Sequence, residues 1–204
     1  MKKIISAGFL LIMIVALTAC SSKSESPKTL AKEGIAPYPL SDSEKYILQS
    51  FGMDDTAQIL SFNAPKEAIG LDVRVYRLED GEKWSTMSSG GISIGADRNP
   101  TDPLTGTFTM QLKENYAIAF NINTEGRASY KTDEILLDEE AMASVKAVLQ
   151  EFQKIEMNKE IPVALMVYDS GTSMRSCSLQ DYFEPSKLAG MDLVQVVTLE
   201  FSDK

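Results

Sequence analysis

Alternation of apolar and polar side chains constrains the fold of this chain more than any other feature. Residues 69–78 alternate, with Leu71, Val73 and Val75 on one side and Asp72, Arg74 and Tyr76 on the other. Because successive side chains of a β-strand point to opposite faces, this period of two predicts a strand with one buried face. Asp80-Gly81 follows, and both residue types tolerate the positive φ that a tight hairpin turn requires. A return strand over residues 84–94 is therefore expected.

The same signals predict further strands separated by turns. The expected strands cover residues 57–62, 69–78, 84–94, 106–113, 116–122 and 127–131, with a bulge or bend at Gly90-Gly91. We interpret this stretch as an antiparallel meander. Two later segments, residues 161–168 and 193–201, are apolar at nearly every position, which is typical of strands buried on both faces.

Two segments carry helical signals. Ser41-Asp42-Ser43-Glu44 has the form of a capping box, which predicts a helix near residues 42–51 that stops at Gly52. Residues 139–156 carry apolar side chains three or four positions apart, which predicts a second helix with one apolar stripe. The stripe consists of Met142, Val145, Val148, Leu149, Phe152 and Ile155.

Since strands outnumber helices, we predict a mostly β fold. The predicted architecture is an antiparallel β-sandwich of about seven to nine strands with two helices packed on it, because evenly spaced turns between short strands are typical of sandwiches. An α+β fold, in which one helix covers a single antiparallel sheet, is the alternative.

The first twenty residues carry the pattern of an export signal. Lys2 and Lys3 precede an apolar run from Phe9 to Leu17. That run is shorter than the roughly 20 apolar residues that a transmembrane helix needs. It ends in Leu17-Thr18-Ala19-Cys20 and is followed at once by polar residues. These residues resemble the lipobox of bacterial lipoproteins.

The resemblance covers residues 1–20 and implies a lipid anchor. In that class of protein the signal peptide, here residues 1–19, is removed, and the cysteine, here Cys20, carries a diacylglyceryl thioether and often an N-acyl chain. Each buried methylene contributes about 0.8 kcal/mol, so two or three acyl chains hold a protein on a bilayer. The expected location is the outward side of the cell membrane, or an outer membrane if the host has two membranes.

The rest of the chain divides into two parts. Residues 20–39 lack hydrophobic periodicity and are rich in Ser, Lys and Pro, which is typical of a flexible tether. Residues 40–204 are expected to form a single globular domain, because a chain of this length can bury about 70% of its surface.

The net charge of the chain limits its expected partners, and its cysteine content limits its expected disulfides. The net charge of −9 becomes two units more negative once Lys2 and Lys3 are removed. Nucleic acid is therefore not an expected partner, and repulsion from anionic lipid favours a body that stands away from such a surface. With Cys20 assigned to lipid, Cys177 is the one cysteine left, and no intramolecular disulfide is expected.

The 204 residues contain no histidine, which excludes several kinds of chemistry. Ser-His-Asp and Cys-His catalysis and His-ligated metal sites all need that side chain. The segment from Gly91 to Gly95 matches the G-x-S-x-G elbow of serine hydrolases, but the elbow also requires a histidine. Phosphate-loop, dinucleotide-binding and CxxC patterns are missing, so no cofactor is expected.

Aromatic residues in the predicted strands are the candidate ligand-binding residues. Trp84, Tyr76 and Tyr116 would stack on sugars, or form a protein-binding surface, if their rings lay exposed in a row. Half-buried cross-strand pairing is the alternative role for such rings.

A short acidic loop is the candidate metal site. Asp97, Asn99 and Asp102 place oxygen atoms at the short intervals that calcium requires. The EF-hand pattern fails, because Asp102 stands where that pattern has glycine and Phe108 where it has glutamate. A solvated turn is the alternative.

These observations favour a lipid-anchored extracytoplasmic lipoprotein whose non-catalytic domain is a binding or accessory module for a cell-envelope partner or ligand, such as a protein or a glycan. The alternative is a hydrolase of envelope or environmental glycans that uses a pair of carboxylates, since such enzymes need no histidine.

Overall fold

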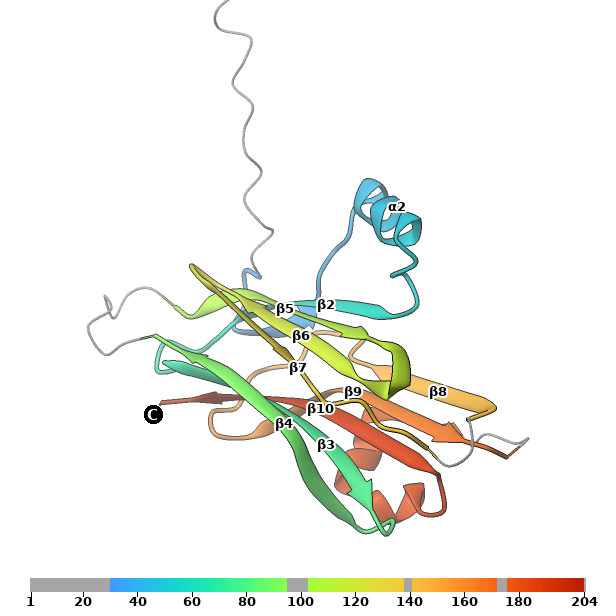
Figure 1. The fold of residues 1–204 in the computed structure, drawn as a ribbon. Coiled ribbons are helices and arrows are strands. Elements are labelled where there is room, and N and C mark those ends of the chain that lie inside the picture. The colour runs from blue at the N-terminus through green and yellow to red at the C-terminus, as the bar shows by residue number, and fades with distance from the viewer. Residues whose placement is uncertain (1–29, 95–102, 138–140, 172–175, 204) are drawn as a thin grey trace, which may run out of the picture.

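Two five-stranded antiparallel sheets form the framework of the computed structural model, which describes residues 30–94, 103–137, 141–171 and 176–203 (Figure 1). Sheet A has the strand order β1 (Gly34–Pro37), β2 (Ala57–Asn63), β5 (Thr105–Leu112), β6 (Ile118–Asn123) and β7 (Arg127–Lys131). Sheet B has the order β4 (Lys83–Ser93), β3 (Gly70–Glu79), β10 (Leu193–Ser202), β9 (Glu160–Asp169) and β8 (Ala143–Val148). The mostly β, sandwich-like fold is thus confirmed.

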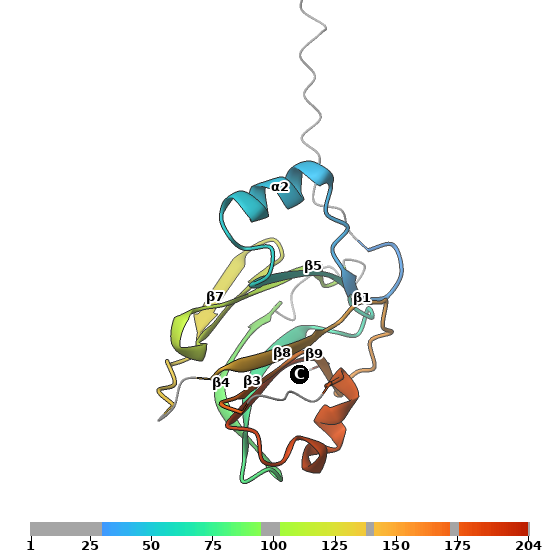
Figure 2. The ribbon, with the colours of Figure 1, turned by 90° about the vertical axis from the view of Figure 1, so that its right-hand side faces the viewer.

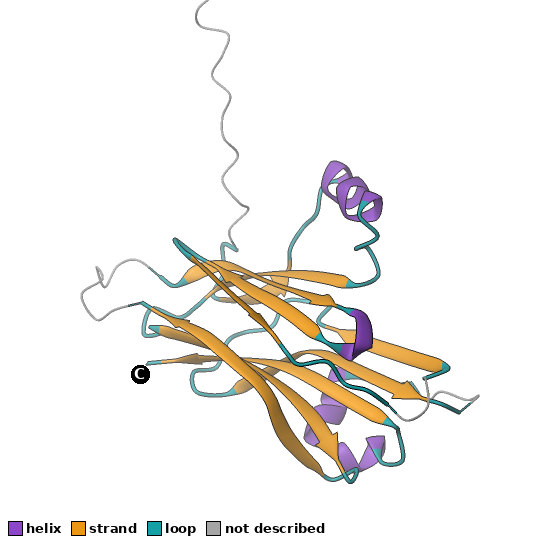
Figure 3. Ribbon diagram, viewed as in Figure 1, coloured by secondary structure: helices purple, strands orange, loops and turns teal. Residues whose placement is uncertain are grey.

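Helices are few in the described part of the chain (Figure 3). Its one α-helix, α2 (Asp42–Ser50), begins at Ser41, and Glu44 completes the predicted capping box. Three short 3₁₀-helices, η1 (Glu114–Tyr116), η2 (Leu179–Phe183) and η3 (Pro185–Leu188), lie in connections. Figure 2 shows α2 beyond sheet A, on the side away from sheet B.

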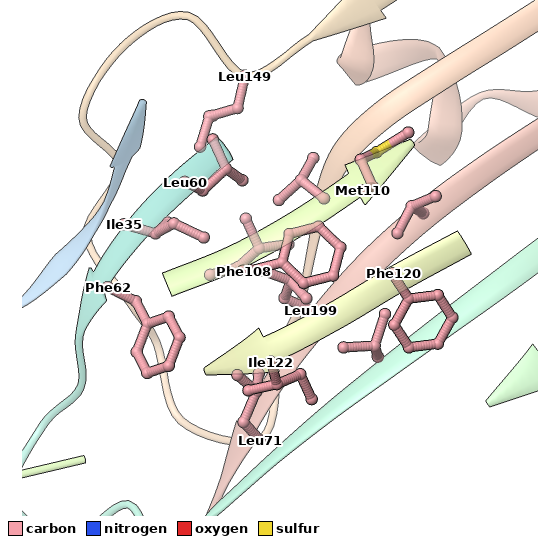
Figure 4. Close-up of a cluster of buried hydrophobic side chains, with 14 of the residues drawn as sticks. Ile35, Leu60, Phe62, Leu71, Phe108, Met110, Phe120, Ile122, Leu149 and Leu199 are labelled. Atoms are coloured by element: carbon pink, nitrogen blue, oxygen red, sulfur yellow. The ribbon is translucent and has the colours of Figure 1, made fainter. Parts of the chain in front are cut away.

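The main hydrophobic core lies between the two sheets (Figure 4). Phe108 and Phe120 of sheet A have ring centroids 6.2 Å apart, and Figure 4 shows them with Leu71 and Leu199 of sheet B. All four side chains are completely buried. The inward-facing positions of the alternating strands therefore supply the core, as the period of two predicts.

A second, smaller core covers the outer face of sheet B. It joins strand residues to Leu188 of η3, and its other buried members are Leu78, Leu165, Val167, Val194 and Val196. Because side chains on both faces of β9 and β10 are buried, the prediction of two-sided burial for these strands is confirmed.

The predicted helix over residues 139–156 is wrong for residues 141–156, while residues 139 and 140 lie outside the described part of the chain. Ala143–Val148 is strand β8, and the Leu149 amide still donates to the Val163 carbonyl of β9. The chain then reaches sheet A, where Ile35 and Gln153 exchange two backbone hydrogen bonds of 2.8 Å. The sequence does have apolar side chains at helical spacing. However, Val145 and Ala147 are also two positions apart, as in a strand, and both pack against the outer core of sheet B. A short apolar run fits both periods, and here pairing with β9 decides the outcome.

Three other expectations need correction. Strand β1 lies within the predicted tether, so the sheet already includes Gly34–Pro37. The predicted meander is divided, because β5, β6 and β7 belong to sheet A while β3 and β4 form a hairpin in sheet B. Helix α2 has no buried residue and does not pack closely on a sheet.

The glycine pair in β4 does not form the predicted bulge. The register of β3 with β4 shifts at Met87, which is the extra residue, and not at Gly90-Gly91. A Cβ atom on Gly90 would lie 2.5 Å from the ring of Tyr130, whose hydroxyl donates to the Gly91 carbonyl at 2.7 Å. The glycines thus let β7 of one sheet approach β4 of the other.

Candidate functional site

Three charged side chains meet on the outer face of sheet B, from three adjacent strands. The strand register places Glu160 of β9 directly opposite Glu200 of β10, and like charges in that position repel each other. Arg74 of β3 relieves this repulsion, because its Nη1 donates to Glu160 Oε1 at 2.8 Å and to Glu200 Oε2. The side chains of all three residues are between 21% and 30% exposed, so solvent screens the ion pairs only in part.

Glu160 is the centre of this network. Its Oε1 accepts hydrogen bonds from Arg74, from the Tyr76 hydroxyl at 2.5 Å and from the Thr198 hydroxyl at 3.3 Å, while its Oε2 accepts from the Tyr182 hydroxyl. Burial alone would raise the pKa of Glu160, but the hydrogen bonds from Tyr182, Tyr76 and Arg74 hold it below the ordinary value. The carboxylate is therefore ionised and held by four donors.

The titratable groups that donate to Glu160 have raised pKa values, which keeps their protons in place. Burial and the hydrogen bond to Glu160 raise the pKa of Tyr76 to about 12 and raise that of Tyr182 further. Hydrogen bonds to Glu200 and Glu160 raise the pKa of Arg74. The two phenols remain proton donors and the guanidinium remains charged across the physiological range.

Helix η2 covers the network with one aromatic side chain, that of Tyr182. Its N-terminus is fixed by a reciprocal cap between Ser178 and Asp181, which places Tyr182 above the sheet. The ring centroid of Tyr182 lies 5.5 Å from that of Trp84 and 6.3 Å from that of Tyr76. Trp84 Nε1 also donates to the Tyr182 carbonyl at 2.9 Å, so a hydrogen bond and a ring contact together fix the orientation of the indole.

A groove of about 460 Å³ opens beside this cover, and we call it the η2 groove. Tyr182 and Glu160 border it on one side, and the exposed ring of Phe183 stands at its rim with 58% of its surface accessible. The remaining lining residues are Gln153, Lys154, Glu156, Lys159 and Ile161. Aromatic rings, an apolar side chain and a few charged groups that line one groove are typical of a binding surface.

Comparisons of this chain with protein-family models, curated proteins and solved structures gave no match.

The network is not arranged for acid catalysis. A carboxylate-based glycosidase needs one carboxyl group that stays protonated, with a raised pKa, to donate to the leaving group. The pKa of Glu160 is lowered, and hydrogen bonds already engage both of its oxygens. The arrangement is suited to holding η2 in place beside the groove.

The structure brings two of the three predicted ligand-binding residues together. Trp84 and Tyr76 both contact Tyr182 at the η2 groove side of sheet B. Tyr116 lies elsewhere, and its ring packs edge-on against Tyr168 with centroids 4.7 Å apart. Trp84 and Tyr76 are half-buried and engaged in hydrogen bonds, so the exposed ring at the groove is Phe183.

Tyr116 has an unusual backbone conformation. Both Asn115 and Tyr116 have positive φ, of 52° and 57°, which costs free energy for residues other than glycine. The completely buried Gln195 of β10 donates through Nε2 to the Tyr116 carbonyl at 3.0 Å, and so holds this turn of sheet A against sheet B.

The other predicted sites lie outside the described residues. This is the case for Cys20 and for the loop with Asp97, Asn99 and Asp102. Within the described ranges, no three acidic or cysteine side chains are grouped to hold a metal ion, and no helix is long and apolar enough to cross a bilayer. Burial and the nearby Asp181 raise the pKa of the half-buried Cys177, which keeps its thiol protonated.

Sequence reasoning missed Arg74, Glu160, Glu200, Tyr182 and Phe183. Arg74 and Glu200 are 126 positions apart in the chain, so no spacing rule joins them. The available signal was a charged residue within or at the end of a strongly apolar strand, since such a charge requires a partner.

Proposed function

We propose that this chain is a lipid-anchored, extracytoplasmic lipoprotein whose domain binds a cell-envelope protein or glycan at the η2 groove without catalysing a reaction. The anchor rests on the lipobox residues Leu17 to Cys20. The binding role rests on the groove, where Phe183 is exposed beside an ordered network that holds Tyr182.

The exposure of Phe183 is the single observation that carries the binding role. Large apolar side chains at the rim of a groove are typical of the anchor residues at binding surfaces. The neighbouring rings of Tyr182 and Phe183, with centroids 5.0 Å apart, give the groove the stacking surface that a sugar ring or an aromatic side chain uses.

The binding role is tested by recovery of partners with two matched variants. The lipidated wild-type protein is used to recover proteins from solubilised membranes, and is sedimented with isolated envelope polymers. Phe183→Ala should abolish recovery of the specific partner or polymer. Leu136→Ala is the control, because this equally apolar side chain is 84% exposed at a different place. Equal recovery by both variants, or no specific partner for the wild type, would contradict the proposal.

The anchor is tested separately by mass spectrometry of the native protein. The expected N-terminal residue is Cys20, with a mass increase for a diacylglyceryl group and an N-acyl chain. Cys20→Ser should move the protein from the membrane fraction to the soluble fraction. An unmodified thiol, or a leader that is still attached, would overturn the proposed location.

A further inference from the structure

Helix α2 leaves three large apolar side chains exposed. Within the helix only Glu44 and Leu48 are partly buried, and together with Ile47 they line a groove against the outer face of sheet A. Tyr46, Ile47 and the C-cap residue Phe51 are 70%, 54% and 72% exposed. A surface helix of a soluble protein normally turns its large apolar residues towards the core.

The charges of α2 are confined to one part of its circumference. At 100° per residue, an arc of about 140° contains Ser43, Tyr46, Ile47, Ser50 and Phe51. No charged residue falls within this arc, and the Ser50 hydroxyl is satisfied by the Tyr46 carbonyl at 2.7 Å. Asp42, Glu44 and Lys45 all lie outside it. We call these five residues the α2 arc.

The helix stands away from the sheet and leaves a groove of about 340 Å³ beneath it. Figures 1 and 2 show α2 as the outermost element on the sheet A side, with sheet B and its 3₁₀-helices on the opposite side. A flat surface that approaches the sheet A side therefore meets α2 before any other described element.

The proposed anchor brings this side of the domain close to a bilayer. Asn63 of sheet A donates to the carbonyl of Leu30 at 3.0 Å, so the described chain begins on the sheet that carries α2. Ten residue steps separate Leu30 from Cys20, and a fully extended chain spans at most about 35 Å over that length. The tether thus keeps the sheet A side within a short distance of the anchored sulfur.

We propose that the α2 arc lies in the interface of the bilayer to which the protein is anchored. This inference rests on the proposed lipid anchor. Tyr, Phe and Ile are side chains that interfacial helices place at the boundary of headgroups and acyl chains. The acidic body is repelled by anionic lipid, so the contact is made by the uncharged arc alone, and the η2 groove points away from the membrane.

The test uses the position of tryptophan relative to the bilayer. The natural chain has one tryptophan, Trp84, on sheet B. The lipidated wild type and the lipidated double variant Trp84→Phe/Tyr46→Trp are each reconstituted in phosphatidylcholine vesicles, with or without bromine near the top of the acyl chains. The brominated lipid should lower the emission of the double variant by about twofold or more, since interfacial helices are buried 5–10 Å. The emission of the wild type should not change.

Two further variants control for charge and folding. Ser50→Glu adds a negative charge inside the α2 arc, and Gln49→Glu adds the same charge at the neighbouring position, which is also exposed but lies outside the arc. In the double-variant background, Ser50→Glu should remove most of the quenching and Gln49→Glu should retain it. Circular dichroism establishes that each variant is folded.

The outcomes separate this inference from the proposed anchor. If the protein floats with the vesicles but the introduced tryptophan is not quenched, or if wild-type Trp84 is quenched equally, the α2 arc does not face the bilayer although the anchor holds. Equal loss of quenching in Ser50→Glu and Gln49→Glu would also overturn the inference that the α2 arc lies in the bilayer interface. If the protein does not float, both the anchor and the inference fail.

Discussion

At the scale of single residues, the carboxylate of Glu160 is held from several directions. It lies opposite Glu200, and Arg74 and three hydroxyl groups hold it in the ionised form. A charge in this position is stabilising only while its partners remain in place.

Replacing this carboxylate should therefore destabilise the fold. Glu160→Gln removes the charge that Arg74 binds and offers an amide to the two tyrosine donors, so we expect the free energy of unfolding to fall by about 2 kcal/mol. Urea denaturation measures the change. Glu156→Gln is the control, since this exposed carboxylate pairs only with Lys159, and no measurable change is expected.

The same pair of proteins should differ in their response to acid. Because the folded-state pKa of Glu160 is lowered from 4.5, its contribution is fully present above about pH 4.5 and is lost as the pH falls through the folded-state value. The stability difference between wild type and Glu160→Gln should thus be constant near neutral pH and shrink below pH 4.5. A difference that grows on acidification would show that the carboxylate is not held in its ionised form.

The tyrosines give a second, independent measure of this environment. Burial raises the pKa of Tyr76 and of Tyr168 to about 12, and burial and Glu160 raise that of Tyr182. Ultraviolet titration should therefore show at least three of the seven tyrosines still protonated at pH 11 in the folded protein. In guanidinium all seven should ionise near pH 10. Tyr182→Phe should reduce the number of late-titrating groups by one.

At the scale of secondary-structure elements, close approach of two strands from different sheets depends on one missing side chain. Gly90 of β4 lies under the ring of Tyr130 of β7, and a methyl group there would overlap the ring. Gly90→Ala should destabilise the protein by about 2 kcal/mol, as is typical of overpacking. Gly126→Ala is the control, because no atom lies within 4 Å of its added Cβ. Equal thermal midpoints for the two variants would refute this role of Gly90.

The elements that the sequence predicts correctly are those with an unambiguous local signal. The alternation around Val73 and the turn at Asp80-Gly81 predict the β3–β4 hairpin, and both turn residues have positive φ. Strand β8 is missed because Val145 and Val148 fit a helical stripe as well as a strand. Strand β1 is missed because Pro37 and its neighbours have the composition of a tether, and only pairing with β2 makes them a strand.

The candidate site was less accessible to sequence reasoning than the fold. Trp84 and Tyr76 were found because they are large aromatic residues in predicted strands, and they do share a contact with Tyr182. Their hydrogen-bond partners, Glu160 for Tyr76 and the Tyr182 carbonyl for Trp84, come from segments far away in the chain. Their meeting depends on strand order, which local periodicity does not specify.

At the scale of the whole molecule, the two sheets differ in how their strands are connected. In sheet A, β5, β6 and β7 pair with their neighbours in sequence, so most of this sheet can form locally. In sheet B, the last strand, β10, lies between β3 and β9 and pairs with both. Val197, Leu199 and Phe201 of β10 fill the shared core, while Val194 and Val196 fill the outer core. Sheet B therefore cannot be completed until the C-terminal strand is present.

Deletion of β10 should accordingly unfold both sheets. A chain that ends at residue 192 leaves β3 and β9 without their common partner and exposes both cores, so we expect no cooperative transition in thermal or urea unfolding. Deletion of residues 203–204 alone should leave the transition unchanged, because these residues follow the last strand. A synthetic peptide of residues 190–204 should restore cooperative unfolding to the truncated chain by occupying the gap between β3 and β9. Cooperative unfolding of the truncated chain without the peptide would mean that sheet A is stable by itself, and that the two sheets do not depend on one shared core.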